Sequence, residues 1–315
     1  MTRTASSVAE GPSRPIAAAS RTSPQSIGLS DLPALLATLF KLRIGVAIAL
    51  SGLGGLVLAA QGWPVPLDLV IFLLALLIAA GGAGAFNHWF DRDMDARMGR
   101  TRQRPFASGR LSPSVIWPSL FMVQMLFGSA LAAWRFGLLS GLFVLAGALT
   151  YALVYTVWLK RRTPLNIVIG GAAGSWAVLA GAAAGGDLLA PAIWALTLVI
   201  FLWTPSHFWC LAIAIRDDYR RAGVPMLPVT HGVATANRWV ALNTTILIIA
   251  SLTLAVLVNH WILWAGALLS SAWLAAKTIA MYRRPEKPIA FSAFKASLVQ
   301  LGLLLIAVFA AASWP

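Results

Sequence analysis

Three oxygen-bearing side chains, Asn87, Asp91 and Asp95, are spaced four residues apart at the end of a long apolar run. At 3.6 residues per turn, this spacing places all three on one face of a helix. Two carboxylates on one face repel each other unless a cation lies between them, and a site built only of oxygen ligands favours Mg²⁺. The spacing therefore predicts a magnesium site that binds substrate phosphates. The alternative is a solvated loop.

Two groups of cations lie near this triplet in the sequence or on the same expected side of the chain. The first consists of Arg97, Arg100, Arg102, Arg104 and Arg110, and the second of Lys160, Arg161 and Arg162. Either group could meet a polyanion, or it could simply mark the cytoplasmic ends of membrane helices. If the topology derived below is right, both groups can converge on the acidic triplet.

His207 and the acidic pair Asp217 and Asp218 form a third polar segment. His207 lies inside an apolar run, about two to three helical turns before the pair. A polar side chain at that depth in a membrane is costly, which makes His207 a candidate for a functional site. A hydrogen-bonded packing histidine is the alternative.

These motifs lie in a chain whose composition indicates an integral membrane protein. Hydrophobic residues make up 59% of the chain and charged residues only 11%, far from the usage of soluble proteins. Apolar runs of about 20 residues suit membrane-spanning helices, whereas barrel strands would be shorter and alternating. We therefore predict an all-α, polytopic membrane bundle of nine transmembrane helices. They cover residues 42–60, 68–90, 112–134, 137–158, 164–185, 190–213, 239–258, 261–281 and 290–312.

The distribution of positive charge predicts the orientation of the bundle. If nine helices alternate, 23 of the 24 Lys and Arg residues lie on one side, and Arg135 is the exception. Cytoplasmic loops of membrane proteins are enriched in Lys and Arg, so we expect the N-terminus in the cytoplasm and the C-terminus on the far side. The formal net charge of +14 then reflects topology, and no nucleic-acid partner is expected.

Residues 1–30 differ from the rest of the chain because they are rich in Ser, Ala, Thr and Pro. Such a segment cannot bury a core, so we predict a disordered cytoplasmic tail. Residues 31–315 are predicted to form one membrane domain. The tail also resembles a mitochondrial transit peptide in its Arg and Ser content, but such tails are common on bacterial membrane proteins.

The chain resembles the UbiA-type intramembrane prenyltransferases. The resemblance is carried by Asn87, Asp91 and Asp95 at their four-residue spacing, followed by Met98…Arg100-Thr101…Arg104-Pro105. Three further segments are similar to the branch of that family that farnesylates heme, and the resemblance spans about residues 30–312. These segments are Arg162-Thr163-Pro164-Leu165-Asn166-Ile167-Val168-Ile169-Gly170-Gly171, Trp203-Thr204-Pro205-Ser206-His207-Phe208-Trp209, and Asp218-Tyr219 with Pro225-Met226-Leu227-Pro228.

The resemblance implies that the chain transfers the farnesyl group of farnesyl diphosphate to a vinyl group of heme b, with addition of water, to give heme O. Asn87, Asp91 and Asp95 would hold Mg²⁺ against the diphosphate, and Asp217 or Asp218 would complete a second metal site. His207 would contact the porphyrin or orient the water. Tyr219 joins the implied catalytic set through its place in the motif, and the implied diphosphate-binding residues are Arg102, Arg104, Lys160 and Arg161.

The resemblance also implies where the enzyme works and what it meets there. We expect a multi-pass protein of the bacterial inner membrane, in contact with the lipid bilayer. A heme A synthase, which would consume heme O, is the implied downstream partner.

One departure from the family pattern affects the expected pocket, and two other functions stay open. After Gly174 the chain reads Ser175-Trp176-Ala177-Val178, where the family usually has a Pro-Pro pair, so the pocket wall should differ there. The first alternative is a UbiA-type enzyme acting on another acceptor, such as a quinone precursor or chlorophyllide. The second is a secondary transporter with an ion site at the acidic triplet. Transporter sites usually lie near the midplane between internal repeats, and no clear repeat is present.

Overall fold

The computed structural model describes residues 28–314, and all regular structure in this range is helical. The predicted tail, residues 1–30, lies outside the described residues except for its last three. Leu29 and Ser30 begin a short 3₁₀ helix, Leu29–Asp31, which leads into α1 (Leu32–Leu39). The predicted all-α fold is therefore confirmed for the described part of the chain.

Nine helical segments of the described chain are long and apolar enough to cross a membrane, as predicted. Large apolar side chains on their outer surfaces, such as Phe127 and Leu269, are exposed, which suits a lipid environment. The spans are α2 (Leu42–Ala59), α3 (Pro66–Phe90), α5 (Ile116–Phe136), α6 with the helix that continues it (Leu138–Leu159), α7 with α8 (Asn166–Gly185), α9 (Pro191–Ala214), α12 (Gly232–Val258), α13 (Trp261–Arg283) and α14 (Lys287–Ser313).

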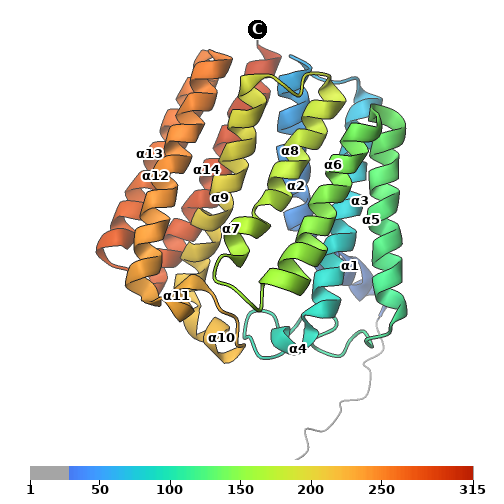
Figure 1. The fold of residues 1–315 in the computed structure, drawn as a ribbon, viewed down its shortest axis with the longest axis vertical. Helices are drawn as coiled ribbons and strands as arrows, with labels where there is room; N and C mark the ends of the chain where they lie inside the picture. Colours follow the sequence, from blue (N-terminus) through green and yellow to red (C-terminus); the bar gives the residue numbers. More distant parts are fainter. Residues whose placement is uncertain (1–27, 315) are drawn as a thin grey trace, which may run out of the picture.

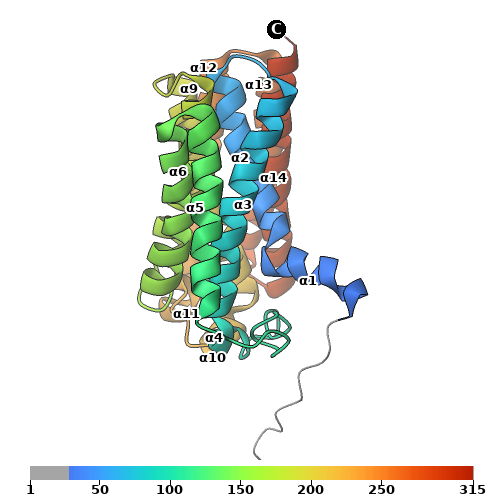
Figure 2. The ribbon, with the colours of Figure 1, turned by 90° about the vertical axis from the view of Figure 1, so that its right-hand side faces the viewer.

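The long helices run side by side, and successive spans alternate in direction (Figure 1). The short helices α4 (Arg92–Asp95), α10 (Arg216–Arg221) and α11 (Leu227–Thr230) gather at one end, and the chain ends at the other (Figure 1). Helix α1 extends sideways from the same end as the short helices (Figure 2). The basic connections therefore share one end of the bundle, as the charge pattern predicted.

Arg135, the one predicted exception to this pattern, is paired at the opposite end. Its Nη2 atom lies 2.7 Å from Oδ2 of Asp68, near the start of α3. Asp68 therefore neutralises Arg135, the one cation that does not follow the enrichment of Lys and Arg on the cytoplasmic side.

Glycines let the backbones of α2 and α8 (Ala172–Gly185) approach closely. A β-carbon at Gly181 would overlap the carbonyl oxygen of Gly52, and one at Gly55 would overlap that of Val178. Without a hydrophobic driving force in lipid, close backbone contact is a main source of helix association. The small-residue clusters are thus accounted for by packing.

Three spans differ from the uniform helices expected from the sequence. Helix α12 begins at Gly232, seven residues before the predicted start at 239, because its polar first turns have partners: Asn237 donates to the carbonyls of Met281 and Tyr282 at the end of α13. The fifth span is interrupted at Gly171, between α7 (Asn166–Gly170) and α8. The fourth changes from α6 (Leu138–Leu149) to a π-helix, Thr150–Leu159.

Candidate active site

The acidic triplet lies where α3 ends, at the basic end of the bundle. Helix α3 stops at Phe90 and the short α4 starts at Arg92, so the predicted single helix is interrupted at Asp91. The four-residue spacing nevertheless continues in the backbone: the amide of Asp91 donates to Asn87 O at 2.9 Å, and that of Asp95 donates to Asp91 O at 2.8 Å. Asn87 Nδ2 also donates to Asp91 Oδ2 at 2.7 Å.

Asp91 is fully buried, and its partners come from the connection after the fourth span. Lys160 Nζ pairs with Asp91 Oδ2, and Arg161 Nη2 lies 3.5 Å from Oδ1. Oδ1 has no hydrogen-bond donor among the described residues. A buried carboxylate oxygen is rarely left without a donor, so Oδ1 is an available ligand atom.

Asp95 is equally buried but is held by its own loop. Arg104 Nη1 contacts both of its carboxylate oxygens, at 3.0 and 2.8 Å. The Thr101 hydroxyl donates to the Asp95 carbonyl at 3.0 Å, which folds the loop back over α4. Arg102, predicted with Arg104 to bind diphosphate, is exposed instead.

Lys41 is a further member of this cluster that the sequence did not reveal. It joins α1 to α2 in the left-handed conformation, with φ 49°. Its Nζ atom donates to Asn87 Oδ1 and, at 2.8 Å, to the Tyr151 hydroxyl. Burial, together with the nearby charges of Arg104 and Lys160, lowers the pKa of Lys41 well below its usual value.

The π-helix supplies the third side of the cluster. Two hydrogen bonds reach back five residues, as the wider turn of a π-helix requires. The backbone amide of Lys160 donates to Tyr155 O at 2.9 Å, and the side-chain hydroxyl of Thr156 donates to Tyr151 O at 2.8 Å. Thr156 also accepts from Asn87 Nδ2 at 3.0 Å. The wide turn thus directs Tyr151, Thr156 and Lys160 toward the end of α3, and such helices are frequent at functional sites.

The cluster carries more positive than negative charge. Lys41, Arg104, Lys160 and Arg161 surround two carboxylates, those of Asp91 and Asp95. When all four bases are protonated, two positive charges are in excess, and an anion placed there would relieve their repulsion and favour the protonated form of Lys41. The arrangement suits a polyanion.

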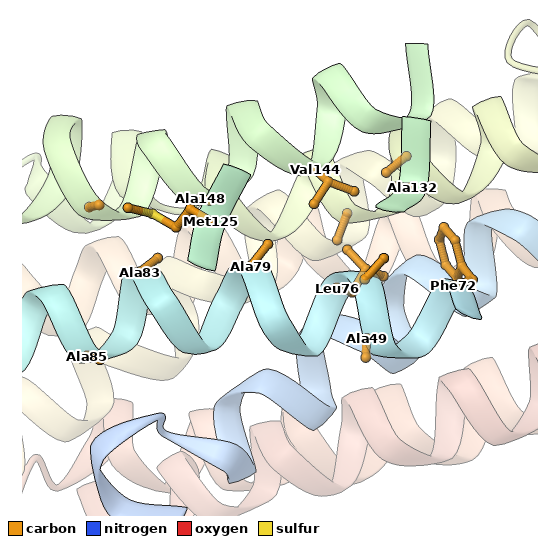
Figure 3. Packing of buried hydrophobic residues seen from close by; sticks show 14 of the residues in the cluster. Ala49, Phe72, Leu76, Ala79, Ala83, Ala85, Met125, Ala132, Val144 and Ala148 are labelled. Carbon is orange, nitrogen blue, oxygen red and sulfur yellow. The ribbon is translucent and has the colours of Figure 1, made fainter. Parts of the chain in front are cut away.

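An apolar cavity begins at the same point. It is lined by α2, α3, α6 with the π-helix, and α8, and it contains about 570 Å³ of space including its open part. Figure 3 shows Leu76, Ala79 and Ala83 of α3 on the side facing Val144 and Ala148. Lys41 and Tyr151 line the cavity and also belong to the charged cluster. A ligand with a charged head and an apolar tail fits both parts at once.

The second acidic motif is placed differently from the first. The Asp217 side chain is 75% exposed, and its Oδ1 atom lies 3.3 Å from Nη1 of Arg220. Asp218 is partly buried, pairs with Arg221, and lies close to the first motif, since a β-carbon on Gly99 would be 3.7 Å from its Oδ2. The structure therefore brings Asp218, and not Asp217, beside the loop that follows Asp95.

Tyr219, the residue after Asp218, packs against the first motif. It is buried and packs in one cluster with Met94 and Met98 of the first motif. Within residues 28–314, no three Asp, Glu, His or Cys side chains gather closely enough to hold a metal by themselves. A magnesium ion here would need the Asn87 amide and phosphate oxygens in addition to carboxylates, which is how Mg²⁺ is usually bound.

His207 belongs to α9 and lies apart from the charged cluster, with its ring packed against α14. Its ring stacks on Trp203 and Phe294, each with ring centroids 4.3 Å away, and its Nδ1 is 2.8 Å from Ser297 Oγ. Because the Ser297 hydroxyl donates to Phe294 O at 2.7 Å, Nδ1 must donate to Ser297. The proton is then on Nδ1, and Nε2 keeps its lone pair.

The sequence of the chain matches the UbiA prenyltransferase family over residues 48–312. The chain belongs to this family. Protoheme IX farnesyltransferase 2 of Paramagnetospirillum magneticum is 46% identical over 274 residues, which is 87% of this chain and 95% of that protein. Protoheme IX farnesyltransferase 1 of the same organism is 43% identical over 281 residues, 88% of this chain and 97% of that protein.

The fold of this UbiA member also agrees with a solved structure of the family. A UbiA homolog from Archaeoglobus fulgidus, solved with GPP and Mg²⁺ bound, aligns with a TM-score of 0.62 over 88% of this chain and 99% of that one. The identity is 18%, so the likeness concerns the fold. Family and fold together make the chain an intramembrane prenyltransferase.

Three residues of this candidate site, Lys41, Tyr151 and Thr156, were not predicted. A lysine at the start of an apolar run gives one usable signal, because a cation is costly there unless it has a partner. The tyrosine and threonine give none, since a helix of ordinary pitch would not direct them to the same place as Lys160.

Proposed function

We propose that the protein transfers the farnesyl group of farnesyl diphosphate to a vinyl group of heme b, with addition of water, to form heme O. One observation carries the proposal: Lys41 and Tyr151 belong both to a cation-rich cluster and to an apolar cavity. A prenyl diphosphate has the charge and shape for this junction. The names of the relatives at 46% and 43% identity support heme as the acceptor.

In this proposal the diphosphate lies among Lys41, Arg104, Lys160 and Arg161. Mg²⁺, held by Asn87, Asp91 and Asp95 with Asp218 nearby, would neutralise phosphate oxygens and improve the leaving group. The available Oδ1 atom of Asp91 and the oxygen-only donor set fit this ion. The cations stabilise the charge that develops on the diphosphate as the bond to the prenyl carbon breaks.

The proposed reaction proceeds through an allylic cation. The electron pair of the carbon–oxygen bond leaves with the diphosphate, and the vinyl π electrons of heme b then form the new carbon–carbon bond. Water captures the resulting cation and loses a proton, which leaves a hydroxyethylfarnesyl side chain. The apolar cavity protects the allylic cation from premature capture by water.

His207 is proposed to serve the acceptor, either by contacting the porphyrin or by orienting the water. Its ring is fixed by two aromatic neighbours and Ser297, which leaves Nε2 as a lone-pair acceptor in a set direction. His207→Ala should therefore impair heme conversion while leaving binding of a farnesyl diphosphate analogue intact. A folded variant that converts heme at the parent rate would remove His207 from the site.

The cellular setting follows from the charge pattern. We propose a bacterial inner-membrane protein whose basic end and N-terminus face the cytoplasm. The diphosphate then enters from the side on which it is made. A heme A synthase that consumes heme O is the proposed downstream partner.

The decisive experiment identifies the product. Purified protein is incubated with labelled farnesyl diphosphate, Mg²⁺ and heme b, and the lipid-soluble product is analysed by mass spectrometry. We expect a heme that has gained one farnesyl group and one water. Parallel incubations with a quinone precursor and with chlorophyllide test the other acceptors, and Asp91→Asn is the inactive control. Labelled product from another acceptor, with none from heme b, would reject the proposal.

A further inference from the structure

An aromatic residue, Phe143, lies at the far end of the apolar cavity and is backed by a second one, Trp176. Phe143 lines the cavity and stacks on Trp176, with ring centroids 5.7 Å apart and planes 20° apart. The Trp176 indole donates to the Thr150 hydroxyl at 3.1 Å, which ties the pair to the start of the π-helix. This pair is a braced floor, because stacking and the hydrogen bond both restrict Trp176.

The positions of the lining residues give the cavity a direction. Lys41, Gly84 and Tyr151 mark its charged end, where their helices reach the acidic cluster. The lining residues farthest along each helix from that end are Ile48, Leu76, Phe143 and Ala177. Eight residues separate Tyr151 from Phe143, so the floor lies about 12 Å below the charged end at about 1.5 Å per residue.

This depth can be compared with the length of prenyl chains. With carbon–carbon bonds of about 1.5 Å in a zigzag, an extended farnesyl chain measures on the order of 14 Å, and a geranylgeranyl chain about 5 Å more. Farnesyl therefore fits with slight folding. Geranylgeranyl would have to displace the floor, and geranyl would leave its lower part empty.

We infer that Phe143, braced by Trp176, sets the length of the prenyl donor and makes this enzyme selective for farnesyl diphosphate. The inference rests on the proposed function, whose donor it specifies. It also gives a role to the segment Ser175–Val178, where the chain departs from its family: Ala177 lines the cavity, and Trp176 stacks on the lining residue Phe143.

The test measures binding without catalysis. Unreactive thiolodiphosphate analogues of geranyl, farnesyl and geranylgeranyl diphosphate are titrated with Mg²⁺ into the full-length protein in detergent. The parent should prefer farnesyl to geranylgeranyl by about tenfold or more, since unfilled or overfilled apolar pockets discriminate on this scale. Phe143→Ala removes about the volume of one isoprene unit and should shift that ratio toward geranylgeranyl by about tenfold.

Two other variants sharpen the result. Trp176→Leu keeps an apolar side chain but removes the brace, so we expect a smaller shift in the same direction. Leu142→Ala is the matched control, because Leu142 is the neighbouring residue of α6 and is 49% exposed toward the lipid side. It should retain the parent ratio.

The possible outcomes distinguish a failure of this inference from a failure of the proposed function. A folded Phe143→Ala protein with the parent ratio would overturn the inference, while heme farnesylation would stand. If that variant does not fold, Ala177→Leu raises the floor instead and should shift preference toward geranyl; an unchanged preference would overturn the inference equally. A parent protein that binds none of the analogues would overturn the proposed function and the inference with it.

Discussion

The two acidic motifs of this enzyme use the same side chains in opposite surroundings. In the first, Asp91 and Asp95 are buried, and Asp91 is paired with Lys160, which is 69 residues away in the sequence. In the second, Asp217 and Asp218 are paired with arginines three residues ahead on the same short helix. The first motif therefore ties distant spans together, whereas the pairs of the second stay within α10.

This difference decides how much each carboxylate contributes. Water and salt weaken exposed pairs, which typically stabilise a protein by about 0–1 kcal/mol. A buried pair is costly to break, because removing one partner leaves the other charge without compensation. Two acidic motifs that look alike in the sequence can thus differ widely in their contribution to stability and activity. The substitutions below are ordered by the expected loss, which follows the burial of each aspartate.

The largest loss is expected for Asp91→Asn. The change removes a fully buried anion that faces Lys160 and Arg161 and is a proposed Mg²⁺ ligand. Turnover of labelled farnesyl diphosphate should fall by about 10²-fold or more. Thermal unfolding in detergent should show a destabilisation of about 3 kcal/mol, because an excess of buried positive charge remains.

A second substitution separates charge balance from metal binding. Asp91→Asn combined with Lys160→Met restores the charge balance of the cluster, so stability should recover in part. Turnover should not recover, since the proposed metal ligand Asp91 is still missing and Lys160, a proposed diphosphate-binding residue, has been removed as well. Recovery of activity in the double variant would show that Asp91 acts only as a counterion.

Asp95→Asn should follow with a smaller loss of about 10-fold to 10²-fold in turnover. Its carboxylate holds Arg104, which lies within the same loop and retains some freedom to reach a phosphate. Asp93→Asn is the matched control, because the Asp93 side chain is 74% exposed and turned away from the cluster. Equal losses at positions 93 and 95 would contradict the argument from burial.

Asp218→Asn tests whether the second motif reaches the first. Asp218 is 20% exposed and lies beside Gly99, so we expect a several-fold loss of turnover. The loss should appear mainly as a higher Mg²⁺ requirement, measured by titrating the ion at saturating prenyl donor. An unchanged Mg²⁺ requirement would place Asp218 outside the metal site.

Asp217→Asn should have the smallest effect. Its side chain is 75% exposed, and its contact with Arg220 is an ordinary surface pair. Turnover should stay within about twofold of the parent, and stability should change by less than about 0.5 kcal/mol. A loss as large as that of Asp218→Asn would mean that the motif acts as a unit and that burial is a poor guide here.

Much of the fold could be predicted because the membrane imposes strong constraints. Within residues 28–314, nine spans and their alternation follow from apolar length and from loop charge, and both were confirmed. The contact between Asn87 and Asp91 follows from helical spacing. The exposed position of Arg102 and the separation of Asp217 from the cluster could not be read from the sequence, because charge and spacing do not specify how a loop folds.

The remaining parts of the site depend on departures from regular geometry. Thr156 contacts Asn87 directly, and Tyr151 is linked to Asn87 through Lys41. Both residues belong to a π-helix, whose wider turn leaves no distinctive pattern in the sequence. Lys41 reaches Asn87 from a joint between two helices. Periodicity assumes a constant pitch, so it does not predict contacts that depend on a change of pitch or on a break.

Lys41 also has a consequence for how freely this site can evolve. Its backbone conformation is one that glycine adopts readily, and for a side-chain-bearing residue it costs about 1–2 kcal/mol. Its ammonium group, however, reaches Asn87 and Tyr151 at the mouth of the cavity. Glycine, asparagine and aspartate tolerate this backbone conformation but would remove the cation, while arginine keeps the charge and the backbone cost and replaces the ammonium with a larger planar group. Drift at this position therefore has no neutral intermediate, and change there requires compensating substitutions elsewhere.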